Sequence, residues 1–206
     1  MDYNVSSKQE QRGILAGMLL GVAKREGCNF SIAHPPSQIG YLLFKKALLE
    51  KITRKPICLR ERKTLNGDRV PYVEPKLIPL TRVLVKKLYP GGVRTITRNF
   101  LNVLTPQGIA IWFMDKGGKS FKKKAGRIHA LEITLNTHLS KEANEVIVAY
   151  FAEVWGIHWG LSKSKGKYRL RLGTRAGKNV LAFLKPYIHS SMLDKIETSY
   201  NKTAAT

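Results

Sequence analysis

Hydrophobic positions recur with helical spacing in several stretches of the chain. The clearest stretch is residues 37–52, where apolar side chains share one helical face: Ile39, Leu42, Leu43, Leu48 and Leu49. Ser37 is the candidate N-cap of this helix, and Thr105 with Pro106 begins another. The pattern predicts further helices at residues 10–23, 80–88, 140–154 and 176–184, with a last helical turn or two near 192–198.

Strand-like runs lie between these helices. They are predicted near residues 29–33, 56–63, 69–75, 127–135, 157–163 and 167–173. Asn66-Gly67-Asp68 joins two of the runs and is a strong hairpin signal, and Lys165-Gly166 joins two others. The sequence therefore predicts two antiparallel hairpins, one in each half of the chain.

The order of elements occurs twice along the chain. Helix, strand, helix, hairpin and helix follow one another in residues 1–103 and again in residues 104–206, with about 93–104 as the linker. This predicts an α+β protein with two similar halves. Because the two strands of a nucleic-acid duplex are related by a two-fold axis, a monomer with internal pseudo-symmetry suits such a partner.

The charge of the chain supports the same class of partner. Thirty-six Lys and Arg residues stand against fourteen Asp and Glu, a formal net charge of +22. Both halves carry the excess, so both are expected to face a polyanion such as nucleic acid. The two cysteines form no metal-binding or disulfide pattern, and no run is long enough to span a bilayer. We therefore expect a soluble intracellular protein, in the cytoplasm or an organelle matrix.

The first predicted helix carries an unusual row of glycines. Gly13, Gly17 and Gly21 recur every fourth residue and so share one face. Each glycine inside a helix costs about 0.5–1 kcal/mol relative to alanine, so the row needs a structural reason. Close contact with a second helix is the best one, and the helix containing Gly108 and Trp112 is the expected partner.

Both of these helices resemble a known motif. Residues 15–23 (LAGMLLGVA) and 104–119 (LTPQGIAIWFMDKGGK) are similar to the two motif copies of single-chain LAGLIDADG homing endonucleases. Lys185-Pro186-Tyr187-Ile188, with Met192 and Lys195-Ile196, resembles their C-terminal end. The resemblance implies two pseudo-symmetric αββαββα halves. It also implies that the motif helices form the interface between them, and that two saddle-shaped antiparallel sheets bind the major groove.

In that family each motif helix ends in an acidic residue, and the pair binds divalent metal over the scissile phosphates. The matching positions here are Val22 and Lys116, which offer no carboxylate. Asp115 and Glu26 are the nearby substitutes, but Asp115 lies about 100° around the helix from the required position. We therefore expect no catalytic residue and no metal or other cofactor, with Mg²⁺ needed only if cleavage has been retained.

Basic side chains are the candidates for nucleic-acid contact. Lys167, Arg169 and Arg171 alternate with apolar residues, as in a strand with one face on the core and the other on a ligand. By resemblance, Lys167 falls near the active site and Arg69 is its counterpart. The other candidates flank a turn, line the first hairpin or form a predicted basic loop: Lys163, Lys165, Arg60, Arg62, Lys63, Lys119, Lys122, Lys123, Lys124 and Arg127.

Three functions are compatible with these residues. The first is a cleavage-inactive protein that binds structured intron RNA as a maturase or splicing cofactor, because phosphate contacts and shape dominate RNA recognition. The second is an intron-encoded, site-specific DNA homing endonuclease with displaced metal ligands. The third is a DNA-binding regulator or a component of a larger ribonucleoprotein. The sequence identifies neither the physiological nucleic acid nor its target site.

Overall fold

The computed structural model describes residues 3–64, 66–164 and 166–198. The N-terminal half has the order αββαββα, with these elements: α1 (Lys8–Leu20), β1 (Lys24–Glu26), β2 (Asn29–Ala33), α2 (Ile39–Thr53), β3 (Arg60–Lys63), β4 (Arg69–Val73) and α3 (Pro79–Leu88). The C-terminal half repeats it: α5 (Pro106–Lys116), β5 (Gly117–Lys124), β6 (Arg127–Leu135), α6 (Lys141–Trp155), β7 (Gly160–Ser164), β8 (Lys167–Leu172) and α7 (Thr174–Leu184). The predicted α+β fold of two αββαββα halves is confirmed.

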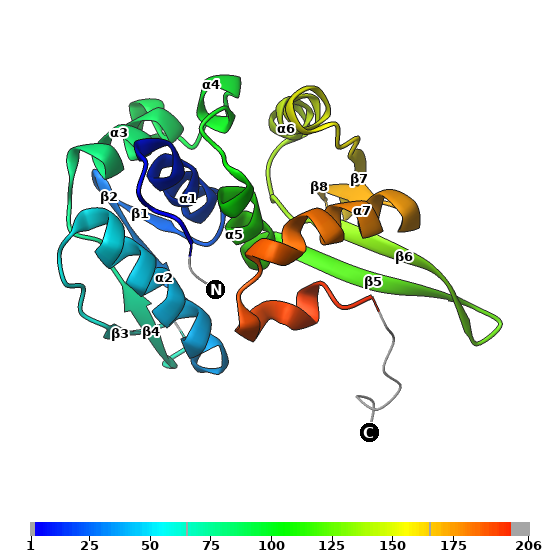
Figure 1. The fold of residues 1–206 in the computed structure, drawn as a ribbon, viewed down its shortest axis with the longest axis horizontal. Coiled ribbons are helices and arrows are strands. Elements are labelled where there is room, and N and C mark those ends of the chain that lie inside the picture. The colour runs from blue at the N-terminus through cyan, green and yellow to red at the C-terminus, as the bar shows by residue number, and fades with distance from the viewer. Residues whose placement is uncertain (1–2, 65, 165, 199–206) are drawn as a thin grey trace.

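Each half contains one four-stranded antiparallel sheet. The strand orders are β1-β2-β4-β3 and β5-β6-β8-β7, so the two sheets share one topology. Figure 1 shows the halves side by side, with α1 and α5 between them. A short helix, α4 (Arg98–Leu101), lies in the segment that joins the halves.

One face of each sheet packs against helices. Buried apolar side chains on this face include Phe30, Ile32 and Val73 in the first sheet and Ile133 and Leu170 in the second. Because strand side chains alternate, the residues between them point to the opposite face, which we call the open face. The pairing register therefore decides which basic residues of a strand can face a ligand.

The ends of the helices follow from local capping. The Thr105 hydroxyl accepts a hydrogen bond from the Gly108 amide, and Pro106 occupies the first turn of α5, as predicted. The prediction that Ser37 caps α2 is wrong, because Ser37 lies inside a 3₁₀ turn and α2 begins at Ile39. The hydrophobic pattern predicted neither β1 nor β5.

The C-terminal segment returns to the N-terminal half. After α7 the chain forms two 3₁₀ segments, η3 (Lys185–Tyr187) and η4 (Ser190–Lys195). The His189 ring stacks on Phe44 of α2 with centroids 4.5 Å apart, and the Tyr3 hydroxyl donates to the Tyr187 carbonyl. These contacts tie the end of one half to the other. Within the described residues, no helix combines the length and apolarity needed to cross a membrane.

Candidate nucleic-acid interface

The two motif helices meet along the glycine row of α1. A Cβ atom added at Gly17 would collide with the backbone of Gly108, and one at Gly13 would collide with the Thr105 side chain. At Gly21, an added Cβ would overlap the Asp115 carboxylate. The row therefore permits backbone contact between the helices. It also aligns their C-terminal ends, where the family's acidic positions would lie.

Asp115 is held inside the protein. Its Oδ2 atom accepts a hydrogen bond from the Val22 amide at 3.1 Å, and its Oδ1 atom accepts one from Lys45 Nζ at 2.5 Å. The side chains of Asp115 and Lys45 are both 0% exposed. The carboxylate is thus neutralised by a lysine from α2 and points away from solvent, so it is unavailable as a simple replacement ligand.

His34 completes this buried group. Lys45 Nζ lies 3.0 Å from His34 Nε2, and the Nδ1 atom lies 2.9 Å from Gln38 Oε1. Since the ammonium and the amide oxygen have fixed roles, Nε2 accepts from Lys45 and Nδ1–H donates to Gln38. Burial, and then the charge of Lys45, lowers the pKa of His34 from 6.5 to about 4, so the ring is neutral near pH 7.

A basic side chain lies at the C-terminal end of each motif helix. Lys116 ends α5, and burial lowers its pKa, while neighbouring Asp115 opposes that shift. At the end of α1, Arg94 donates hydrogen bonds to the Leu19 and Leu20 carbonyls at 3.4 and 3.0 Å. Arg94 was not among the predicted residues, because it lies in an irregular segment with no periodic signal.

Lys167, at the start of β8, acts on the same side chain as Lys116, the imidazole of His138. Partial burial, followed by the charges of Lys116 and Lys167, lowers the pKa of His138. The end of α5 and the start of β8 therefore place positive charge around one imidazole. The region at the helix tips attracts anions such as phosphate and disfavours a divalent cation.

The open face of the first sheet carries two of the predicted arginines. In the register, Arg60 is opposite Tyr72 and Arg62 is opposite Val70. Arg62 donates to the Ser31 hydroxyl at 3.2 Å, and its guanidinium lies 5.3 Å from the centroid of the Tyr72 ring.

The other two candidates of this sheet, Lys63 and Arg69, lie on its opposite face. Lys63 pairs with Arg69, and both alternate with the open-face positions, so they lie on the helix-covered side. Arg69, whose side chain is 74% exposed, lies 3.7 Å from Glu61. Arg69 therefore does not share the open-face position of Lys167.

The open face of the second sheet is centred on one carboxylate. Glu132 of β6 is within 3.7 Å of Lys122, 3.5 Å of Arg169 and 3.5 Å of Arg171. A single carboxylate on β6 thus pairs with three cations from the two neighbouring strands, β5 and β8. Lys167 continues this face along β8.

The two candidates predicted beside the second hairpin turn are Lys163 and Lys165. Lys163 pairs with Tyr168, which places it on the helix-covered side, against the prediction. Lys165 lies outside the described residues.

The predicted basic loop after the second motif is a strand. β5 runs from Gly117 to Lys124 and pairs with β6 along its length. Lys119 does not face a ligand there, because its Nζ atom donates to the Asp194 and Glu197 carbonyls of the C-terminal segment. The remaining members of the cluster are exposed on this hairpin: Lys122, Lys123, Lys124 and Arg127.

Comparison with known proteins assigns the family. A sequence profile described as the LAGLIDADG DNA endonuclease family matches residues 12–180. This chain is a LAGLIDADG-family protein. RecA proteins of Mycolicibacterium flavescens and Mycolicibacterium fallax are each 26% identical to it, over 88% and 91% of the chain. The chain spans less than half the length of these two relatives, 42% and 46%.

Solved LAGLIDADG structures share the fold. The homing endonuclease I-WcaI bound to its DNA recognition sequence superposes with a TM-score of 0.76 at 19% identity, over 96% of this chain and 90% of that one. Meganuclease I-SmaMI bound to uncleavable DNA gives 0.57 at 12% identity, over 92% and 88%. At these low sequence identities, the superpositions show that the fold is shared and nothing more.

The LAGLIDADG metal site does not fit the residues present here. Val22 and Lys116 occupy the expected acidic positions and supply no anionic oxygen. Glu26 lies on β1, where it accepts a hydrogen bond from Ser31 at 3.1 Å and sits 3.9 Å from Arg62. Across the described ranges, no three His, Cys, Asp or Glu side chains are grouped so as to hold a metal ion.

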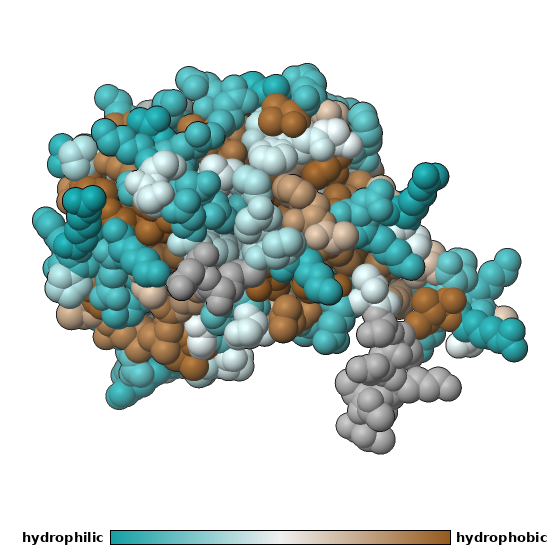
Figure 2. All heavy atoms as spheres, viewed as in Figure 1, coloured by the Kyte–Doolittle hydropathy of each residue, from teal (hydrophilic) through white to brown (hydrophobic). Residues whose placement is uncertain are grey.

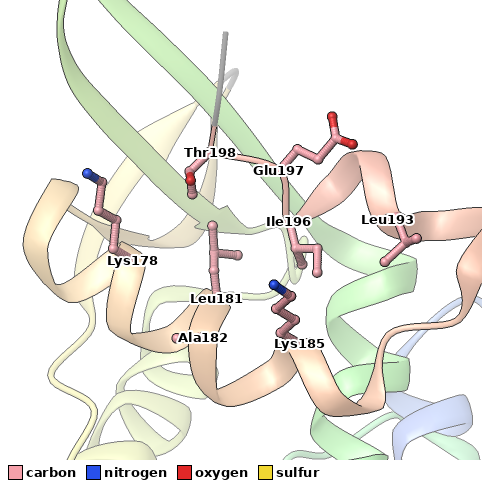
Figure 3. Close-up of a pocket in the computed structure, with 8 residues that line it drawn as sticks. All are labelled: Lys178, Leu181, Ala182, Lys185, Leu193, Ile196, Glu197 and Thr198. Carbon is pink, nitrogen blue, oxygen red and sulfur yellow. The ribbon is translucent and has the colours of Figure 1, made fainter. Parts of the chain in front are cut away.

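Two other features lie away from the open faces of this LAGLIDADG protein. Trp112, predicted at the helix interface, stacks on Phe151 of α6 with centroids 6.0 Å apart, so it anchors α5 in the C-terminal core. A hollow of about 520 Å³ lies between α7 and the C-terminal segment (Figure 3). Since α7 covers the core face of β6, this hollow is on the helix side of the sheet.

Proposed function

We propose that this protein binds a double-helical nucleic acid across its two open faces and does not cleave it. The observation that carries the proposal is the chemistry at the helix tips, where valine and lysine replace the two carboxylates. Hydrolysis through paired metals requires anionic oxygens to hold the cations. The nearest carboxylate, Asp115, is already paired with Lys45.

The cations at the tips provide a direct alternative to metal-mediated phosphate contact. Lys116 ends α5, and Arg94 caps the carbonyls at the end of α1. The charges of Lys116 and Lys167 both act on His138, so positive charge gathers near the helix ends where the family's acidic residues would lie. An ammonium or guanidinium attracts a phosphate but cannot polarise it and activate water as a metal pair does. Binding is therefore retained while the hydrolytic step has no support.

Structured intron RNA is the ligand that we propose first, with a role as maturase or splicing cofactor. RNA helices are recognised largely through phosphates, sugars and shape, and this surface is rich in cations and lacks cleavage chemistry. A DNA duplex is the second candidate. It is favoured because the similar structures of I-WcaI and I-SmaMI contain DNA.

A binding selection followed by a cleavage assay tests this proposal. The protein is incubated with pools of random-sequence DNA duplexes and of structured RNAs, and the retained molecules are then exposed to Mg²⁺ or Mn²⁺. We expect retained molecules to stay intact, and the pool that is enriched identifies the ligand class. Metal-dependent strand cleavage that disappears in Glu26→Gln or Asp115→Asn would contradict the proposal and support displaced metal ligands.

A further inference from the structure

The two sheets differ in the length of one hairpin. In the C-terminal half, β6 pairs with β8 only from Ile133 onward, so residues 127–132 of β6 extend beyond that pairing. In the N-terminal half, only residues 29–31 of β2 extend beyond the pairing with β4 at Ile32. Three additional residues per strand add about 10 Å. Figure 1 shows the β5–β6 hairpin projecting from the body of the molecule.

We call the projecting part, residues 122–130, the arm. Its turn is a tight one in which Ala125 and Gly126 both have positive φ, at 48° and 75°. Such a turn matches the right-handed twist of the strands and gives a formed hairpin. A register shift between Lys122 and Lys123 marks a bulge, a feature that bends a hairpin. The arm is therefore a shaped extension of the sheet.

The charge of the arm has one sign. No Asp or Glu occurs from Gly117 to Leu131. The basic residues of the arm are exposed: Lys122, Lys123, Lys124 and Arg127. Figure 2 shows hydrophilic side chains at the far end of this projection. The shorter β1–β2 hairpin differs, because Arg25 bonds to the Gly92 carbonyl and Glu26 adds a negative charge.

We propose that the arm makes phosphate contacts outside the central interface, so that the protein covers a longer stretch of duplex on the side of its C-terminal half. The proposal rests on duplex binding across the open faces. A duplex presents about one phosphate charge per 1.7 Å of axis, so an extra length of about 10 Å meets roughly six phosphates and about three base pairs. Four cations are enough to contact several of them, with Lys122 exchanging its 3.7 Å contact with Glu132 for one with a phosphate.

Hydroxyl-radical footprinting on a duplex recovered from the selection tests the arm. The arm variant is Lys122→Gln with Lys123→Gln, Lys124→Gln and Arg127→Gln. The control removes the same charge from exposed helical positions, with Arg82→Gln, Lys86→Gln, Lys87→Gln and Lys178→Gln. We expect an asymmetric footprint for the native chain and the control. The arm variant should lose about three base pairs of protection at one end only, with a salt slope smaller by about 2–4.

The outcomes separate the two proposals. If no duplex is retained by the native chain, binding across the open faces is wrong. If a duplex is retained but its footprint is symmetric, or the arm variant and the control protect the same length, only the arm proposal is overturned. A thermal melt that matches the native chain shows that each variant is folded.

Discussion

At the scale of single residues, the site differs from expectation because its partners are distant in sequence. Asp115 accepts one of its two hydrogen bonds from Lys45, which is 70 positions away, and the other from Val22, which is 93 positions away. No local pattern reveals such a pair. The sequence showed that the acidic positions are occupied by Val22 and Lys116, but the burial of Asp115 required the structure.

His34 in this buried group predicts a pH dependence of stability. Its pKa is about 4 in the folded chain and 6.5 as the reference value, so the unfolded chain binds more protons between these limits. The free energy of unfolding should therefore fall as pH decreases through this window and be unaffected by His34 above it. Between about pH 7.5 and about pH 5.5 the loss is about 1 kcal/mol.

Urea denaturation of the native chain and of His34→Gln at both pH values measures this loss. Glutamine can accept from Lys45 but does not titrate, so the variant should lack this part of the pH dependence. Equal pH dependence of the two proteins would show that the imidazole is not held neutral.

At the scale of elements, the glycine row should contribute to stability by letting α1 and α5 pack closely, and a substitution in the row tests this. Gly17→Ala should destabilise the fold by about 3 kcal/mol or more, because the new methyl group collides with the Gly108 backbone and main-chain atoms cannot rotate away. Gly40→Ala is the matched control. Its added Cβ would find its nearest neighbour, Ser191, at 3.8 Å, so we expect no loss of stability. Thermal unfolding of both variants measures the difference, and an unchanged melting temperature for Gly17→Ala would disprove backbone contact at this position.

The strands show how far a sequence pattern can predict elements. The alternation in residues 167–172 predicted β8 and the outward direction of Arg169 and Arg171. β1 reads Lys-Arg-Glu and β5 is rich in lysine, so neither contains the apolar alternation that marks a strand. Their pairing with β2 and β6 supplies the stability that their own sequences do not indicate.

The direction of side chains was harder to predict than the position of the strands. A shift of one residue in the register moves a side chain to the other face of the sheet. Lys63 and Lys163 were grouped with the candidate ligand-binding residues because they are basic, and Arg69 was grouped with them by resemblance, as the counterpart of Lys167. Their pairing partners place them on the helix-covered side.

At the scale of the whole molecule, the repeated order of elements predicted two similar halves. The resemblance of residues 15–23 and 104–119 to the LAGLIDADG motifs supplied the complete αββαββα topology, and the family match over residues 12–180 confirms that assignment. The crossing of the C-terminal segment to α2 had no counterpart in the pattern, since it depends on contacts such as His189 with Phe44.

Because only the open faces are expected to contact phosphates, cations on these faces should contribute more to the salt dependence of binding than cations on the helix-covered faces. The open-face variant combines Arg60→Gln, Lys167→Gln and Arg171→Gln. Its control combines the exposed residues of the other face, as Lys63→Gln, Arg69→Gln and Lys163→Gln. Each set removes three positive charges. Plots of log K against log salt should lose about 2–3 units of slope in the first variant and less than about 1 in the second. Equal losses would mean that net charge matters more than its position.

The contact between α1 and α5 also fixes the distance between the two sheets. Apart from the Thr105 and Asp115 side chains, this contact is made by the main chains around Gly17 and Gly108, so the separation of the two sheets depends on few variable side chains. New targets can therefore arise by exchanging residues on the strands while the gap between the two recognised segments stays constant. A half taken from another LAGLIDADG protein with the same glycines should meet its new partner at the same separation.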